Sequence, residues 1–151
     1  MITDEKKQAL KQFLSIPDEE MDNIVQCEEN TLRIYNEEYL ILTDMEADDR
    51  AREDIERSLW AFMPNFILSH CSTYENMSNW EYDKAKEALE KLQSHFAEAI
   101  NPLIKAMIQD LDEFINDAII EDGRGHFISI YDGRENEEKV NGVTYYIYRI
   151  N

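Results

Sequence analysis

Apolar residues recur at intervals of three and four over four stretches of the chain, which predicts helical regions with one buried face each. The first stretch lies within residues 3–15 and would end before Pro17, because proline cannot continue a helix. The other three begin near Thr43, near Tyr82 and at Asn101. Their apolar positions, in chain order, are Ala51, Ile55, Leu59, Phe62 or Met63, and Phe66; then Tyr82, Ala85, Leu89, Leu92, Phe96 and Ala99; then Ile104, Met107 or Ile108, Leu111, Ile115 and Ile119.

Local signals mark where these helices start and stop. Thr43 precedes Glu46 by three residues, the spacing of a capping box, so a helix is expected to begin there. Pro64 should kink or divide this helix, and Pro102 suits the first turn of the last one. Gly123 is expected as the C-cap of that last helix, since glycine adopts the backbone conformation that ends many helices.

Two other regions are rich in β-branched and aromatic residues or alternate apolar with polar positions, as strands do. Residues 23–42 predict a hairpin or a three-strand meander with a turn at 36–38. Residues 126–150 predict a second hairpin, with strands at 127–131 and 143–150 and with Asp-Gly and Asn-Gly as turn signals.

The order of these elements is helix, strands, helices, strands. This order predicts an α+β fold in which three to four helices pack on one face of an antiparallel sheet built from the two hairpin regions. The sequence has only four Gly and three Pro, so no linker is expected and residues 1–151 are predicted to form a single domain. Hydrophobic residues make up 43% of the chain, which is enough for a buried core.

The chain carries 33 acidic and 15 basic residues, a formal net charge of −18 at pH 7. Solubility needs a net charge of only about 2–8 on a small domain, and the self-repulsion of a larger surplus destabilises the compact state. The acids occur in every third of the chain, so the surplus is a folded, polyanionic surface rather than an acidic tail. Binding to nucleic acid depends on Lys and Arg that neutralise phosphates, so such a surface either stays away from nucleic acid or imitates it.

The acids are densest in the helix that starts at Thr43. Acids in a first turn are favourable against the helix dipole, but those further along need another cause. One face of a helix presents only about one charge per 5–6 Å, whereas duplex DNA carries one per about 1.7 Å of axis, so mimicry would need several acidic elements to converge. The expected partner-binding residues in this helix are Asp44, Glu46, Asp48, Asp49, Glu53, Asp54 and Glu56.

An Asp-Gly-Arg sequence occurs twice, ten residues apart, around a predicted strand. The two turns could bring an acid–base or phosphate-contacting cluster together, with His126 as the proton carrier. Asp122 or Asp132 would orient this histidine, while Arg124 or Arg134 would hold an anionic group. The alternative is structural, because Asp-Gly is a common turn dipeptide and glycine caps helices.

No other pattern indicates a metal, a cofactor or a known catalytic motif, so none is expected. His70 and Cys71 are adjacent and have no second cluster to complete a zinc site, and residues 132–138 depart from a calcium loop at two positions. Residues 1–5 lack the features of a secretory signal, and the longest apolar run is too short to span a bilayer. We therefore expect a cytoplasmic protein with both cysteines reduced.

Several stretches of the chain resemble a family of small acidic proteins found on bacteriophages and other mobile elements, which generally have no assigned function. The resemblance covers most of the chain from Glu38 onward and transfers no catalytic residues. It implies a phage context, and so the cytoplasm of a host cell, where small acidic proteins resemble inhibitors of restriction or CRISPR nucleases. The matching stretches are residues 38–48 (EYLILTDMEAD), 58–62 (SLWAF), 122–126 (DGRGH), 131–133 (YDG) and 146–151 (YIYRIN).

These observations lead to one main hypothesis and two alternatives. The main hypothesis is a non-enzymatic, DNA-mimic-like inhibitor or modulator of the anti-restriction or anti-CRISPR class, which binds a basic nucleic-acid-binding host protein and neither nucleic acid nor membrane directly. The first alternative is a small phage enzyme or nucleotide-handling protein centred on residues 123–133. The second is a structural or regulatory phage protein without mimicry, whose acidic surface is merely solvated.

Overall fold

The computed structural model describes residues 2–151, and this part of the chain divides into two compact units. The first unit consists of the residues up to Ala51 together with Asp122–Asn151, and the second is Arg52–Glu121. By sequence, the first unit carries 19 acidic and 9 basic residues and the second 14 and 6, which are net charges of −10 and −8. The boundaries fall inside helix α2 (Asp44–Arg57) and near the end of helix α6 (Leu111–Asp122). The sequence contains no sign of this division, because neither boundary lies in a linker.

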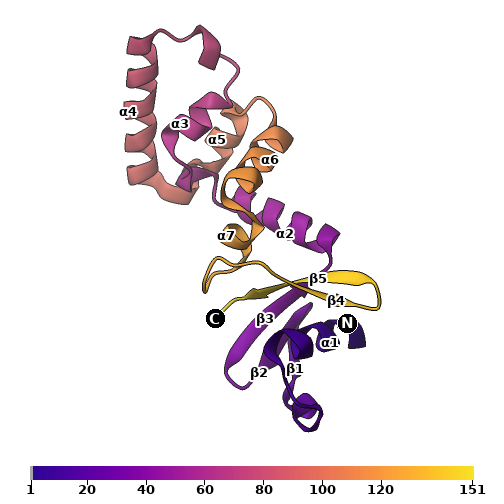
Figure 1. Ribbon diagram of the computed structural model, residues 1–151. Helices are drawn as coiled ribbons and strands as arrows, with labels where there is room; N and C mark the ends of the chain where they lie inside the picture. Colours follow the sequence, from indigo (N-terminus) through magenta and orange to yellow (C-terminus); the bar gives the residue numbers. More distant parts are fainter. Residues whose placement is uncertain (1) are drawn as a thin grey trace. The chain divides into compact units, whose positions relative to one another are not determined.

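A five-stranded antiparallel sheet with the order β1-β2-β3-β5-β4 forms the centre of the first unit (Figure 1). Its strands come from the two predicted hairpin regions, so the predicted α+β fold class is confirmed. The order places β1 and β4 at the two edges of the sheet. The strands are β1 (Val25–Glu28), β2 (Thr31–Ile34), β3 (Glu37–Leu42), β4 (Asn136–Val140) and β5 (Val143–Arg149).

Two short turns set the registers of the β4–β5 and β2–β3 hairpins. Asn141 and Gly142, with φ of 51° and 82°, connect β4 to β5 as the Asn-Gly signal predicts. The turn between β2 and β3 is Tyr35-Asn36, and Glu37 already pairs with Ile34. The predicted turn at 36–38 was therefore placed too late along the chain.

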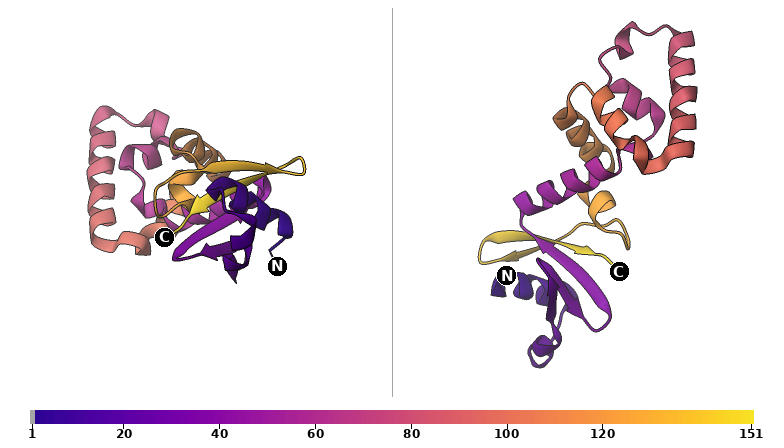
Figure 2. Two further views of the ribbon diagram at one scale, coloured as in Figure 1. Left: turned by 60° about the horizontal axis from the view of Figure 1, so that its bottom comes forward. Right: turned by 180° about the vertical axis from the view of Figure 1, so that it is seen from behind.

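Helix α1 (Asp4–Leu14) packs against β3, β4 and β5 on one face of the sheet, as Figures 1 and 2 show. The Thr3 hydroxyl caps its N-terminus by accepting a hydrogen bond from the Lys6 backbone N–H at 3.3 Å. Full burial of each large apolar side chain contributes about 1.5–3 kcal/mol. The buried core between α1 and the sheet includes Ala9, Leu10, Leu32, Ile34, Tyr39, Ile41, Tyr145 and Ile147.

The second unit consists of helices. The helices expected to form one layer on the sheet are therefore divided between the two units. Pro64 begins α3, and α2 ends seven residues before it, so the expected division at this proline is confirmed. Aromatic rings of Phe62, Phe66 and Phe114 pack together at centroid distances of 4.9–5.4 Å. The elements are 3-10 helix η2 (Leu59–Ala61), α3 (Pro64–Ser69), 3-10 helix η3 (Tyr74–Asn76), α4 (Asn79–Phe96), 3-10 helix η4 (Ala97–Ile100), α5 (Asn101–Met107) and α6, drawn in Figures 1 and 2.

The helix predicted from Asn101 to Gly123 is wrong in its continuity, since α5 and α6 are separate helices. Between them, Ile108 forms an isolated β-bridge with Cys71. The backbone N–H of Gln109 donates to the carbonyl oxygen of His70 at 2.9 Å. These backbone bonds to the segment at His70 and Cys71 take the place of the hydrogen bonds that would continue α5 into α6. The spacing of apolar residues along the sequence does not predict such long-range bonds.

The strand predicted at 127–131 is also wrong. Residues Arg124–Ile128 form the short helix α7, and the first strand of the second hairpin is β4, which lies in the segment expected to be a loop. Gly123 precedes α7 with φ of 81° and ψ of 154°, a backbone conformation that allows a sharp turn after α6. A short apolar run such as this one satisfies either period, and burial of Gly125 and Ile128, three residues apart, selects the helix.

No helix within residues 2–151 has the length and apolar character needed to cross a membrane.

Candidate functional site

Arg124, the first residue of α7, lies at the centre of a cluster of three carboxylates in the first unit. Its Nε and Nη2 donate to the two carboxylate oxygens of Glu135 at 2.9 and 3.1 Å. Its Nη1 donates to Asp44 Oδ1 at 2.8 Å and to Asp48 Oδ1 at 2.9 Å. The guanidinium also lies 4.4 Å from the centre of the Tyr146 ring. One cation thus connects α7, the N-terminal half of α2, and the segment that leads into β4.

The electrostatics of this cluster favour a permanently charged arginine. Burial alone would lower the pKa of Arg124, whose side chain is only 11% exposed, but the hydrogen bonds to Glu135, Asp44 and Asp48 outweigh burial and raise its pKa. The Tyr148 hydroxyl donates to Glu135, and burial together with this carboxylate raises the pKa of Tyr148. Both groups therefore keep their protons at neutral pH, and the cluster links three segments of the first unit through ion pairs and hydrogen bonds.

Gly125 explains why Arg124 can reach Glu135. A Cβ atom at Gly125 would lie 2.6 Å from the carbonyl oxygen of Gly133 and 2.7 Å from backbone atoms of Arg134 and Glu135. The two Asp-Gly-Arg turns therefore touch through their backbones, which only a glycine permits at this position. This close approach assigns the repeated sequence a structural role.

The residues of the catalytic alternative are brought together only in part. His126 is exposed on α7, and within the described part of the chain its ring contacts Phe127 and makes no hydrogen bond to a carboxylate. Asp132 instead accepts hydrogen bonds from Ser129 Oγ at 2.9 Å and from the Arg134 backbone N–H at 3.0 Å. Burial would raise the pKa of Asp132, but these bonds lower it. Asp122 is exposed at the end of α6, so no acid–base pair is assembled around His126.

The carboxylates expected to bind a partner along α2 are mostly paired within the chain. In the first unit Asp44 and Asp48 bind Arg124, as described above, and Asp49 has no ion-pair partner among residues 2–151. In the second unit, Glu53 and Asp54 lie 3.6 and 3.8 Å from Arg57. Glu56 lies 3.4 Å from Arg52 and 3.7 Å from Lys105. Helix α2 is therefore not a row of uncompensated charges.

Glu46 forms the predicted capping box and gains a further partner that sequence spacing did not reveal. Its Oε2 accepts from the Thr43 backbone N–H at 2.8 Å, and its own N–H donates to Thr43 Oγ1 at 3.4 Å. The same Oε2 lies 2.6 Å from Nζ of Lys6, a residue that is only 4% exposed. Burial would raise the pKa of Glu46, but the bonds from Lys6 and Thr43 outweigh it and lower the pKa.

We expect Glu46→Gln to lower the free energy of unfolding by about 1–3 kcal/mol at pH 7, because the buried ammonium of Lys6 would lose its carboxylate. The pKa of Glu46 is lower in the folded state than its ordinary 4.5, so this contribution is present above that pH and is lost as the pH falls. Urea unfolding at pH 7 and pH 3 should show a difference between variant and wild type that shrinks at the lower pH. Glu137→Gln, at an exposed and unpaired site, serves as the control, and a pH-independent difference would contradict the assignment.

A second acidic region of the first unit was missed by the sequence reasoning. We call it the acidic edge, and it consists of Asp18, Glu19, Glu20, Asp22, Glu28 and Glu29. The first four lie in the 3-10 helix η1 (Asp18–Asn23), and the last two lie at the end of β1 and in the turn that follows. Six acids within twelve residues were the available signal.

Few internal cations neutralise the acidic edge. Asp18 pairs with Lys11, and Glu20 accepts a hydrogen bond from the Tyr35 hydroxyl. The other four carboxylates have no side-chain partner within residues 2–151. A 3-10 helix has three residues per turn and rises about 2.0 Å per residue, so the four acids of η1 lie within about two turns of one another. The acidic edge is therefore a dense local group of carboxylates with little internal compensation.

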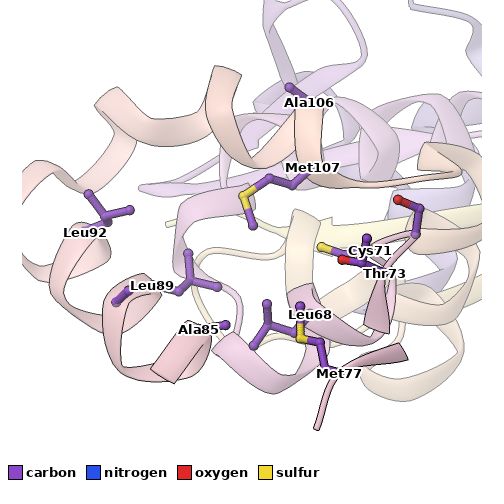
Figure 3. A pocket seen from close by; sticks show the side chains of 11 residues that line it. Leu68, Cys71, Thr73, Met77, Ala85, Leu89, Leu92, Ala106 and Met107 are labelled. Carbon is purple, nitrogen blue, oxygen red and sulfur yellow. The ribbon is translucent and has the colours of Figure 1, made fainter. Parts of the chain in front are cut away.

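An apolar groove of about 430 Å³ lies in the second unit, between α4 and the segments that contain α3 and α5. Figure 3 shows Leu89 and Leu92 of α4 on one side and Met107 and Cys71 on the other. Burial raises the pKa of the Cys71 thiol, which favours its protonated form at neutral pH. The groove has the size of a ligand site, but its lining contains no charged side chain that would orient a ligand.

Metal ligation finds no geometric support in residues 2–151, where no three His, Cys, Asp or Glu side chains lie together as ligands. Both cysteines are free thiols, with Cys27 exposed and Cys71 half-buried. In comparisons with known proteins, no family model, no curated protein and no solved structure matches the chain.

Proposed function

We propose that this protein is a non-enzymatic acidic binding protein that occupies the basic, nucleic-acid-binding surface of another protein and so inhibits or modulates it. The observation that carries this proposal is the acidic edge, a dense group of exposed carboxylates that internal cations leave largely unpaired. Mimicry needs carboxylates gathered on one surface, and six acids lie within twelve residues at the acidic edge.

The internal ion pairs support a specific role for the remaining acids. In the first unit, Arg33 and Arg149 lie 4.0 and 3.0 Å from Glu38 and Glu37, and Lys6, Lys11 and Arg124 bind the carboxylates described above. Most basic residues of this unit are therefore engaged in stabilising its fold. The acids left over add self-repulsion to the folded state, a cost that binding to a basic partner would remove.

The contact lies in the first unit at the acidic edge rather than along α2. Asp44, Glu46 and Asp48 already bind Arg124 or Lys6, and a partner's cations would have to replace these internal ones. Asp49 is the α2 carboxylate of this unit that is available as an additional contact. The resemblance to small acidic phage proteins makes a host restriction or CRISPR nuclease the class of partner that we propose.

The proposal is tested by immobilising the full chain and passing a bacterial lysate over it at low salt. We expect basic nucleic-acid-binding proteins to be retained and to be released by a short DNA duplex, because both ligands would compete for one surface. Their release should also rise steeply with salt. Added in solution, the chain should inhibit DNA binding by the retained protein. Retention that a DNA duplex does not reverse would contradict mimicry.

A further inference from the structure

Strand β1 is an edge strand whose outer side pairs with no other strand within residues 2–151. It pairs with β2 through Val25 and Gln26, and a bulge then shifts the register before Glu28. All four of its side chains are exposed, including Val25 at 49%. An edge of this kind presents backbone N–H and C=O groups to which an extended chain can add as a further strand.

The acidic edge lies directly beside this strand in the sequence and in the fold. The η1 acids end at Asp22, two residues before the buried Ile24 that precedes β1. At the other end, Glu28 is the last residue of β1 and Glu29 lies in the turn to β2. Carboxylates thus flank both ends of one open strand. Like charges in proximity destabilise strand pairing, so the flanks repel acidic strands, including those of a second copy of this chain, and favour a cationic segment.

We propose that β1 docks an extended, Lys- or Arg-rich segment of the partner protein by strand addition. This inference rests on the proposed function and specifies the part of the basic partner that is bound. Backbone hydrogen bonds to β1 supply the geometry, while Asp22, Glu28 and Glu29 pair with cations near the two ends of the added strand. Side chains of the added strand point alternately to the two faces of the sheet, and the exposed Val25 side chain offers an apolar contact to those on its own face.

The probe is a synthetic nine-residue peptide in which lysine alternates with valine or threonine, titrated into the full chain at low salt. We expect Asp22→Asn, Glu28→Gln and Glu29→Gln together to weaken binding at least tenfold. The matched control combines Glu121→Gln, Asp122→Asn and Glu137→Gln, three exposed carboxylates with no side-chain partner in residues 2–151. This control removes the same charge elsewhere and should weaken binding less than threefold.

Strand addition is separated from simple charge attraction by the peptide backbone. The same peptide N-methylated at its five central residues keeps its charge but cannot pair, so we expect its binding to fall at least tenfold. In the ¹⁵N-labelled chain, the unmethylated peptide should slow amide hydrogen exchange within Val25–Glu28. Equal losses for the two triple variants, or unchanged binding after N-methylation, would overturn the proposal.

The two proposals fail in different ways. If the chain captures a DNA-binding protein that DNA releases, but N-methylation has no effect on the peptide, then β1 docking is wrong and the proposed function stands. If the peptide adds to β1 but no retained protein is released by DNA, then docking is supported and mimicry is wrong.

Discussion

Gly125→Ala will destabilise the first unit by about 3 kcal/mol, because the new Cβ would overlap backbone atoms that cannot move aside independently. The overlap would be with the Gly133 carbonyl oxygen at 2.6 Å and with atoms of Arg134 and Glu135 at 2.7 Å. Relieving it requires α7 to move away from the segment before β4, which would also pull Arg124 from Glu135. Denaturant unfolding followed by circular dichroism measures the loss.

Gly142→Ala is the matched control for this variant. Gly142 has φ of 82° but nothing within 4 Å of an added Cβ, so the change tests backbone strain without steric overlap. We expect it to cost about 1–2 kcal/mol, the usual penalty of a left-handed conformation for a residue with a side chain. A Gly125→Ala protein as stable as the wild type would mean that the two Asp-Gly-Arg turns are not in backbone contact.

Arg124→Ala is the second large effect that we expect, a loss of about 2–4 kcal/mol in the free energy of unfolding. Removing one partner of a buried ion pair costs about 3–5 kcal/mol. We expect a smaller loss for Arg124→Ala because the side chains of Asp44 and Asp48 are largely in water. Three carboxylates would be left without their shared cation. The Tyr148 hydroxyl would be the remaining partner of the Glu135 carboxylate, which would have lost its positive charge. Thermal and urea unfolding at pH 7 measure the change.

Arg134→Ala is the control, since Arg134 occupies the same place in the second Asp-Gly-Arg turn. Its side chain is exposed and forms no ion pair within residues 2–151, so its replacement should change stability by less than about 0.5 kcal/mol. Arg124→Lys should recover only part of the loss, because an ammonium cannot make the two-point contact with Glu135. Equal effects of the two alanine variants would contradict the central role of Arg124.

Gly125→Ala and Arg124→Ala separate the structural interpretation of the Asp-Gly-Arg turns from the catalytic one. Their losses are expected in unfolding experiments, whereas a catalytic arginine would affect activity in a protein of normal stability. The contacts of Arg124 and Gly125 thus give the repeated sequence a structural explanation. They join α7 to the segment before β4 by an ion pair and a close backbone contact. The acidic edge is a separate surface, and its carboxylates can be altered without changing the contacts of Arg124 and Gly125.

The sequence by itself determined the features that depend on neighbours within a few residues. The capping box of Thr43 and Glu46, the Asn141-Gly142 turn and the new helix at Pro64 are all correct, because each follows from local backbone chemistry. The helix α4 was found for the same reason, since a helix repeats every 3.6 residues. Its predicted apolar stripe is correct only in part, because Phe96 and Ala99 are exposed and Ala99 lies beyond the end of the helix.

The tertiary structure decided which charges remain available. Lys6 reaches Glu46 across 40 positions of sequence, and Arg124 reaches Asp44 and Asp48 across 80 and 76. No local spacing encodes such pairs, so the acids of α2 were expected on an open surface although the fold neutralises most of them. The choice of helix for α7 likewise depends on burial against distant segments, because its short apolar run fits either period. Local chemistry thus set features such as the start of α2 and the Asn141-Gly142 turn, and long-range packing set which carboxylates are paired within the chain.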